Sequence, residues 1–268
     1  MKDKRVLYVS SEVIPYLPET EISSMSFEAP KMVNDNGGQI RIFMPRYGNI
    51  NERRHQLHEV IRLSGMNLVI NDLDMPLIIK VASIPKERMQ VYFIDNDDYF
   101  KRKATFADEE GNFFKDNDER AIFFAKGVIE TVKKLNWSPD VIHVHGWLAS
   151  FLPLYLRNYY GTEPLFENSK IVTSVYNQGF DGTLNNKVME KILFDGIEEE
   201  SIEELKDPTY SNLMKVAVKN SDAAIIGSEE IPEELESYLN SLDKPVLKYH
   251  KKEDFSEAYL DFYESKVL

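Results

Sequence analysis

The sequence predicts an α/β fold built on a single Rossmann-like, doubly wound sheet that is mostly parallel and carries an antiparallel β excursion. Short apolar runs alternate with helical patterns along the second half of the chain, which is typical of parallel strands joined by right-handed helical crossovers. Between residues 57 and 94, strand-like runs follow one another with no helical pattern between them, which indicates antiparallel pairing. We expect one domain over residues 1–268, with 57–94 as its β-rich excursion.

The first half of the chain opens with a short run of β-branched and aromatic residues, which predicts a buried strand. The helical pattern that follows ends at Asn36-Gly37-Gly38, a typical helix stop, and Pro45 closes the next apolar run. A longer helix is predicted from apolar residues at helical spacing, with Asp116 or Asp118 as its N-cap. The elements expected here are the strand Arg5–Ser10, the helix Phe27–Asn34, the strand Ile40–Met44 and the helix Asp118–Leu135.

The second half alternates apolar strand-like runs with helical patterns. The strands are expected at Asp140–His145, Lys170–Tyr176, Ala223–Ser228 and Pro245–Tyr249. The helices between and after them are expected at Trp147–Tyr159, with an irregularity at Pro153, and at Tyr210–Lys219, Pro232–Asn240 and Asp254–Lys266.

Composition narrows the classes of partner. The chain has 32 Lys+Arg against 45 Asp+Glu, and the resulting net charge of −13 argues against nucleic acid as a partner. No run of apolar residues approaches the length of a membrane span, so we expect no membrane partner and a cytoplasmic location. The absence of cysteine excludes disulfides and thiolate nucleophiles. A neutral ligand such as a carbohydrate meets no electrostatic repulsion from this chain.

Ligands of doubly wound sheets bind beyond the carboxyl ends of the strands, and a histidine pair lies near one such end. Alternation along the strand places His143 and His145 on one face, with His145 nearer the end. His145 could bind sugar hydroxyls while Trp147 stacks on a pyranose ring. The alternative is a satisfied core histidine and a packed tryptophan, since both residue types are often buried. The pair lacks the HExxH spacing of a zinc site, so no metal is expected.

A second polar group follows the expected strand Lys170–Tyr176. Tyr176, Asn177 and Gln178 could satisfy sugar hydroxyls. The alternative is a polar turn in which Gly179 supplies a positive φ.

Two acidic runs are expected to be structural. Glu198–Glu204 is expected to be the solvated start of a helix, because Asp and Glu favour the first turn. Asp95–Asp98 is expected to be a surface turn, because it lacks the glycine and the terminal glutamate of an EF-hand loop.

The loop after the first strand, Ile14–Ser26, is a poor site for phosphate. A phosphate-binding loop needs glycines for close backbone approach and free N–H groups at a helix start. This loop has no glycine, and it contains Pro18, which lacks an N–H, together with Glu19 and Glu21. Two carboxylates would repel a diphosphate.

Taken together, several segments resemble the N-terminal, acceptor-side domain of bacterial glycogen synthases and plant starch synthases, glycosyltransferase family 5. The resemblance is collinear over about Lys4–Glu234. It implies one lobe of a GT-B fold, in which two Rossmann-like lobes face a cleft. It also implies transfer of glucose from ADP-glucose to the 4-hydroxyl of an α-glucan, with retention and without a metal or another cofactor. The segments that carry it are VLYVSSEVIPY, MPRYGNI, VYFIDNDDYFKR, DNDERAIFFAKGVIE, PDVIHVHGW and SDAAIIGSEEI.

The chain departs from the family pattern at the residues that the resemblance assigns to donor binding and transfer. The family's Lys-Thr-Gly-Gly-Leu loop reads as a degenerate donor loop here, its lysine position falling on Pro18 and its glycines on Thr20 and Glu21. The family's His-Asp-Trp-His reads His145-Gly146-Trp147-Leu148, and its transfer-site histidine position is Tyr176. The residues of the degenerate donor loop are Pro18, Glu19, Thr20, Glu21 and Ser24.

Three functions remain open from these observations. The first is a catalytically incomplete, single-lobe relative, a pseudoenzyme that binds α-glucan or another protein, because only about forty residues follow SDAAIIGS. The second is an active glucosyltransferase, alone or with a separate donor-binding chain. The third is an interaction protein, either a homodimer or a partner of a full-length glycosyltransferase, in which Tyr16, Trp147 and Phe180 would otherwise be exposed. No catalytic residue is assigned; the candidate ligand-binding residues are His145, Trp147, Tyr176, Asn177 and Gln178.

Overall fold

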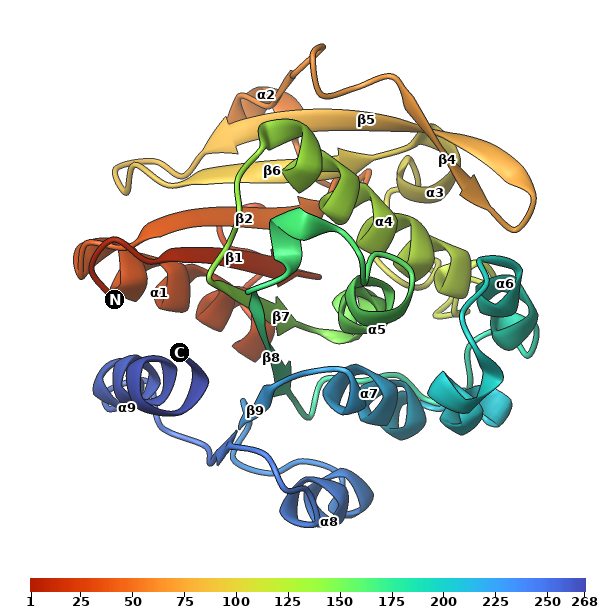
Figure 1. Cartoon of the computed structure of the whole chain (residues 1–268). Helices are drawn as coiled ribbons and strands as arrows, with labels where there is room; N and C mark the ends of the chain where they lie inside the picture. The colour runs from red at the N-terminus through yellow and green to blue at the C-terminus, as the bar shows by residue number, and fades with distance from the viewer.

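A computed structural model describes residues 1–268 and contains one ten-stranded sheet (Figure 1). The strands are β1 (Arg5–Ser10), β2 (Gln39–Pro45), β3 (His58–Glu59), β4 (Met66–Ile70), β5 (Leu73–Ser83), β6 (Gln90–Asp95), β7 (Val141–His145), β8 (Lys170–Val175), β9 (Ala223–Ile226) and β10 (Val246–Leu247). Their order is β10-β9-β8-β7-β1-β2-β6-β5-β3, with β4 paired to β5.

The sheet is parallel from β10 to β6 and antiparallel beyond it. In the parallel part, Val6 is in register with both Ile40 and Val141. In the excursion, β5 runs antiparallel to β6, β4 and β3. The predicted fold class, a mostly parallel sheet with an antiparallel segment, is therefore confirmed. At the start of the excursion expected over residues 57–94, only His58 and Glu59 pair as a strand.

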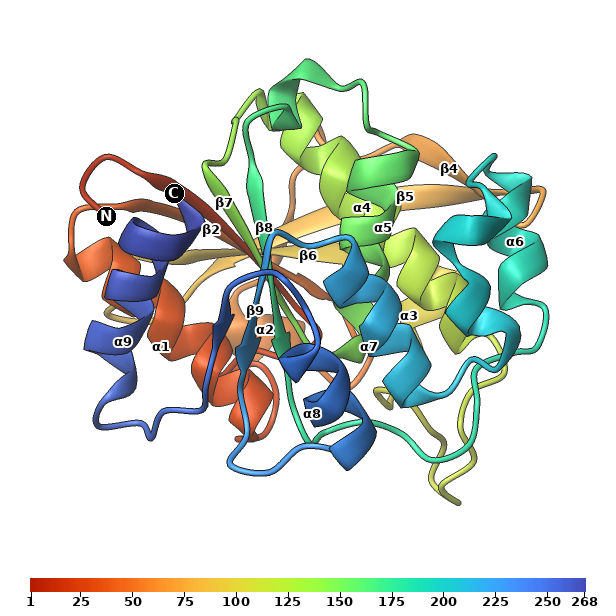
Figure 2. The same cartoon turned by 60° about the horizontal axis from the view of Figure 1, so that its bottom comes forward.

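Helices cover both faces of the sheet (Figure 2). One layer contains α1 and α9, which contact each other, and the other contains α4, α5 and α7. The helices are α1 (Glu21–Asp35), α2 (Glu52–His55), α3 (Asp97–Phe100), α4 (Asn117–Leu135), α5 (Phe151–Asn158), α6 (Val188–Phe194), α7 (Tyr210–Lys219), α8 (Glu233–Asn240) and α9 (Phe255–Phe262), which continues as a π turn over Tyr263–Val267. None of them is long and apolar enough to cross a membrane.

Helix α1 begins earlier than the sequence predicts. Its N-cap is Thr20, whose hydroxyl accepts from the Ser23 N–H at 3.0 Å, while the Ser23 hydroxyl accepts from the Thr20 N–H at 2.8 Å. This reciprocal capping box makes Glu21 the first helical residue. The second half of the loop expected over Ile14–Ser26 is therefore helical.

Other differences have local causes. The segment Trp147–Tyr159 divides into a 3-10 turn, Trp147–Ala149, and α5, whose first turn contains Pro153, where no N–H is needed. The run Glu198–Glu204 forms two short 3-10 turns instead of starting a helix. Asp95 is not on a surface turn, because its buried carboxylate pairs with Arg46 at 3.0 Å and Lys80 at 3.1 Å.

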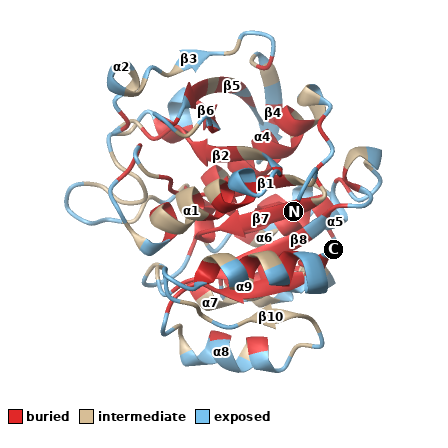
Figure 3. Ribbon diagram, turned by 90° about the vertical axis from the view of Figure 1, so that its left-hand side faces the viewer, coloured by how far each residue is buried: buried red, intermediate tan, exposed pale blue.

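The centre of the sheet is buried on both faces (Figure 3). Every residue of β7 and β9 is buried, which explains why they read as continuous apolar runs. The carboxyl ends of the parallel strands all lie at one edge of the sheet, because the strands share one direction. The candidate site is built from the loops at that edge.

Candidate functional site at the carboxyl ends of the strands

Hydrogen bonds join the loops that follow β1, β8 and β9. The buried Glu12 carboxylate accepts from the Thr20 hydroxyl at 2.6 Å and from the Gln178 side-chain amide at 3.0 Å. The Asn177 N–H donates to the Ser228 hydroxyl at 2.9 Å, and that hydroxyl donates to the Glu21 carboxylate. The structure therefore brings the predicted residues Gln178 and Asn177 together with the degenerate donor loop.

The histidine pair lies beneath these loops on one face of β7, with ring centroids 3.9 Å apart. His143 is saturated, because one ring nitrogen lies 2.6 Å from the Tyr263 hydroxyl and the other 2.7 Å from the Ser174 hydroxyl. His145 Nδ1 lies 2.7 Å from the Tyr176 hydroxyl, while its buried Nε2 has no partner. His143 therefore matches the core-histidine alternative, and His145 is the less satisfied of the two.

Burial keeps both imidazoles neutral. It lowers the pKa of His145 to about 3 and the pKa of His143 well below its ordinary value, the latter with a further contribution from His145. At neutral pH, neither ring carries a charge that could stabilise an anionic group.

Tyr176 is buried and fully packed. Its ring lies over Gly227, where a Cβ would collide with it, and its carbonyl accepts from the Tyr210 hydroxyl. Burial raises the pKa of Tyr176 well above its ordinary value, so its hydroxyl stays protonated. A protonated, buried phenol is unsuited to general base catalysis.

Trp147 belongs to an aromatic cluster and is only 2% exposed. Its ring centroid lies 4.7 Å from Phe106, 5.0 Å from Phe180 and 5.6 Å from Phe113. These neighbours cover its ring, so stacking on a sugar would require the cluster to move. Phe106, Phe113 and Phe180 are partly exposed, and Phe113 and Phe180 stack on each other at 5.0 Å.

The expectation that a single lobe exposes Tyr16 and Trp147 is wrong. Tyr16 is 5% exposed because it packs edge-on against Phe93 and His55. Of the three aromatic residues expected at the surface, only Phe180 is partly accessible.

Carboxylates surround the N-terminus of α1. A hollow of about 260 Å³ is lined by Glu21, Asn177, Ser228, Glu229 and Glu230. A neighbouring hollow of about 310 Å³ includes residues of the degenerate donor loop in its lining, namely Glu19, Thr20, Glu21 and Ser24, together with Glu28 and Lys252. Glu21 itself complements the positive end of the helix dipole, which leaves little electrostatic attraction for an anionic ligand.

Three glycines shape this edge, and Gly179 differs from the expectation. Gly179 does not have a positive φ; it is needed because a Cβ there would meet the ring of Tyr210. The positive φ of that loop belongs to Gly182, at +76°. Gly146 has φ +79° and faces the Ser11 hydroxyl so closely that a side chain would collide with it.

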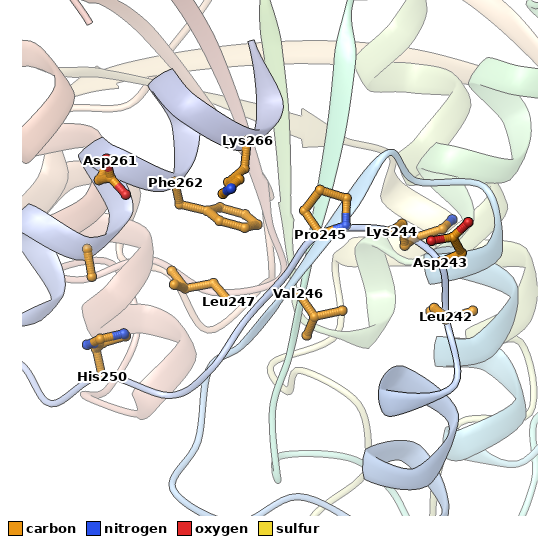
Figure 4. Close-up of a pocket in the computed structure, with 11 residues that line it drawn as sticks. Leu242, Asp243, Lys244, Pro245, Val246, Leu247, His250, Asp261, Phe262 and Lys266 are labelled. Atoms are coloured by element: carbon orange, nitrogen blue, oxygen red, sulfur yellow. The ribbon is translucent and has the colours of Figure 1, made fainter.

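A larger hollow, about 710 Å³, lies away from these residues (Figure 4). It lies between the edge strand β10 and α9, with Val246, Leu247 and Phe262 among its apolar lining residues. None of the predicted site residues lines it.

Sequence reasoning missed three residues of the site. Glu12 and Ser228 lie two residues after the ends of β1 and β9, so the rule that ligands bind at strand ends could have indicated them. Phe113 lies in a long loop before α4, and no local pattern connects it to Phe180.

Comparison with known proteins agrees with this architecture. Residues 5–244 match the family model of the starch synthase catalytic domain. The chain is 37% identical over 222 residues to a glycogen synthase of Chlorobium luteolum, covering 82% of this chain and 45% of that protein. It is 33% identical over 250 residues to a glycogen synthase of Chlorobaculum tepidum, covering 91% of this chain and 49% of that protein.

A solved structure gives the same fold. The catalytic domain of starch synthase IV from Arabidopsis thaliana, bound to ADP and acarbose, superposes with a TM-score of 0.75 at 17% identity, covering 92% of this chain and 51% of that one. The chain thus spans about half the length of the curated relatives it matches. It belongs to the glycogen and starch synthase family, glycosyltransferase family 5, and corresponds to the N-terminal lobe of the family's catalytic domain.

Proposed function

We propose that this chain is a glucan-binding lobe that does not hold a sugar nucleotide at the N-terminus of α1. The observation that carries the proposal is the Glu21 carboxylate, which lies at the first residue of α1 and is hydrogen-bonded to Ser228. A helix terminus that binds a diphosphate offers free N–H groups and positive charge. Here the terminus carries its own carboxylate.

Neighbouring carboxylates would add to the repulsion between Glu21 and a diphosphate. Glu19, Glu28, Glu229 and Glu230 line the two hollows beside Glu21. The family resemblance places a lysine at Pro18, which has neither a cation nor an N–H to offer. A pyrophosphate at this edge would meet carboxylates and few donors.

The residues near Tyr176 also offer no group suited to acid–base catalysis of glucose transfer. Tyr176 takes the place of the family's histidine, and its hydroxyl is bound to His145 inside the core. Both groups are neutral because burial shifts their pKa values away from neutrality. Neither is positioned to contact a transferred sugar without rearrangement.

The glucan side retains suitable groups. Phe113 and Phe180 form a partly exposed stacked pair, and the apolar face of a pyranose packs well on such a ring. The exposed Asn177 and the partly exposed Gln178 place amides, which both donate and accept, close by in the chain. Neutral hydroxyls meet no repulsion from the nearby carboxylates and can donate to them.

Affinity electrophoresis in gels containing glycogen tests the glucan part. We expect the wild-type chain to be retarded and Phe180→Ala to bind about tenfold more weakly, because it removes the aromatic platform. Phe194→Ala is the matched control, since Phe194 is 55% exposed on α6 and lies outside the site. Unretarded wild-type protein, or equal losses in the two variants, would overturn the glucan assignment.

The donor part is tested by thermal unfolding with ADP-glucose. A nucleotide at a hundredfold excess over its Kd would raise stability by about 2.7 kcal/mol, and we expect no such shift at millimolar ADP-glucose. Transfer of labelled glucose to glycogen, by this chain alone or with a separate donor-binding chain, would support the active-enzyme alternative instead.

A further inference from the structure

A basic hollow lies beside the antiparallel part of the sheet. It has a volume of about 600 Å³ and lies between the end of α2 and the turn that joins β5 to β6. Figure 3 shows α2 and β3 along the outer edge of the sheet, beside β5. Because β5 is antiparallel to β6, this turn lies at the amino ends of the parallel strands. The hollow is therefore separate from the loops that carry Asn177 and Gln178.

Three cationic side chains line this hollow without a carboxylate partner. Arg54 comes from α2, and Lys86 and Arg88 come from the turn. All three are exposed, and none of them forms an ion pair. In a chain with a net charge of −13, this hollow is lined by three cations and by no carboxylate, which makes it a positive region.

The nearby carboxylates are already bound elsewhere. Glu87, in the same turn, accepts from Lys31 at 2.7 Å. Glu52, at the start of α2, pairs with Lys80 at 2.7 Å and with Arg46 at 3.3 Å. Neither can neutralise the cations of the hollow without giving up these partners.

The backbone of the hollow's wall is also unusual. Gln56, Lys86 and Arg88 have φ values of +55°, +72° and +53°, and they are three of the chain's seven non-glycine residues with positive φ. Such conformations are costly for residues with a side chain and persist where the surroundings fix them, often at ligand sites. The lining contains a single hydrophobic residue, Ile84, so an apolar ligand does not fit.

We propose that this hollow binds a small phosphate-bearing anion through Arg54, Lys86 and Arg88. Guanidinium groups bind phosphate oxygens in bidentate fashion, and a lysine adds a compact charge. His55, which also lines the hollow, offers a ring nitrogen. This inference does not depend on the proposed glucan function.

Isothermal titration calorimetry with inorganic pyrophosphate at low ionic strength tests the site. The triple variant Arg54→Gln, Lys86→Gln, Arg88→Gln removes its three cations. The control triple Lys103→Gln, Lys170→Gln, Lys187→Gln removes the same charge from exposed lysines elsewhere that form no ion pair. We expect saturable binding by the wild type and the control, and at least about a tenfold loss of affinity in the first triple.

Two results would overturn the proposal. One is the absence of saturable binding by the wild type, and the other is an equal loss in both triples, which would indicate only a nonspecific charge effect. Vesicles of phosphatidylcholine with phosphatidic acid distinguish a lipid headgroup from a free anion. Capture by these vesicles without pyrophosphate binding would also contradict a site for a small soluble ligand.

Discussion

Lowering the pH from 7.5 to 5 is expected to reduce the free energy of unfolding by about 4 kcal/mol, because two buried histidines must stay neutral in the folded state. In the unfolded chain each imidazole takes up a proton near pH 6.5. In the folded chain His145 does so only near pH 3, and the pKa of His143 is also strongly lowered. The unfolded state therefore binds more protons between these values, and stability is lost as pH falls below about 6.5.

Urea unfolding at several pH values measures this effect. His145→Gln keeps a polar group beside Tyr176 and removes one of the two titrating rings, so the pH-dependent loss should fall to about half. His58→Gln is the control for the loss of a histidine, since His58 is exposed on β3. If the free energy of unfolding of His145→Gln falls with pH as steeply as that of the wild type, the buried ring of His145 is not the source of the pH dependence.

Asp195→Ala is expected to lower the free energy of unfolding by about 3–5 kcal/mol. The Asp195 carboxylate lies 2.8 Å from the Lys126 ammonium, and both side chains are almost fully buried, at 7% and 4% exposure. The same carboxylate accepts from the Tyr155 hydroxyl at 2.6 Å, and Lys126 also donates to the Val69 carbonyl at 2.9 Å. Removing the carboxylate leaves a buried ammonium without its counter-charge.

Chemical denaturation of two further variants tests this prediction: one is a control, and the other should restore the lost stability. Glu203→Ala removes half of an exposed pair with Lys206, and it should change stability by less than about 1 kcal/mol. Lys126→Met combined with Asp195→Leu removes both buried charges, and it should recover most of the loss. If Asp195→Ala costs no more than Glu203→Ala, the buried pair does not stabilise the packing of α4 against the end of α6.

The elements buried on both faces could be predicted closely from sequence. β1 and α7 have the predicted bounds, and β7 and β8 differ by one residue, because continuous apolar runs and clear helix stops mark them. The start of α1 could not be placed, since it depends on a side-chain exchange between Thr20 and Ser23. The short helix α6 was missed because its seven residues are too few to show a helical period.

The sequence predicted which loops form the site, but it did not predict which of their side chains are exposed. The rule of strand ends correctly brings Asn177 and Gln178 near the loop after β1. It gives no information on what covers Trp147, because Phe106 and Phe113 come from a distant loop. The hydrogen-bond partner of His143, Tyr263, lies in the last helical turn of the chain, and no local sequence pattern predicts such a contact.

The fit of Tyr176 over Gly227 couples the residues that these two positions can hold. A residue with a side chain at 227 would exclude the phenol ring from its present place. A substitution of Gly227 therefore requires a smaller residue at 176, whereas a smaller residue at 176 places no steric demand on 227. The dependence between the two positions runs in one direction only.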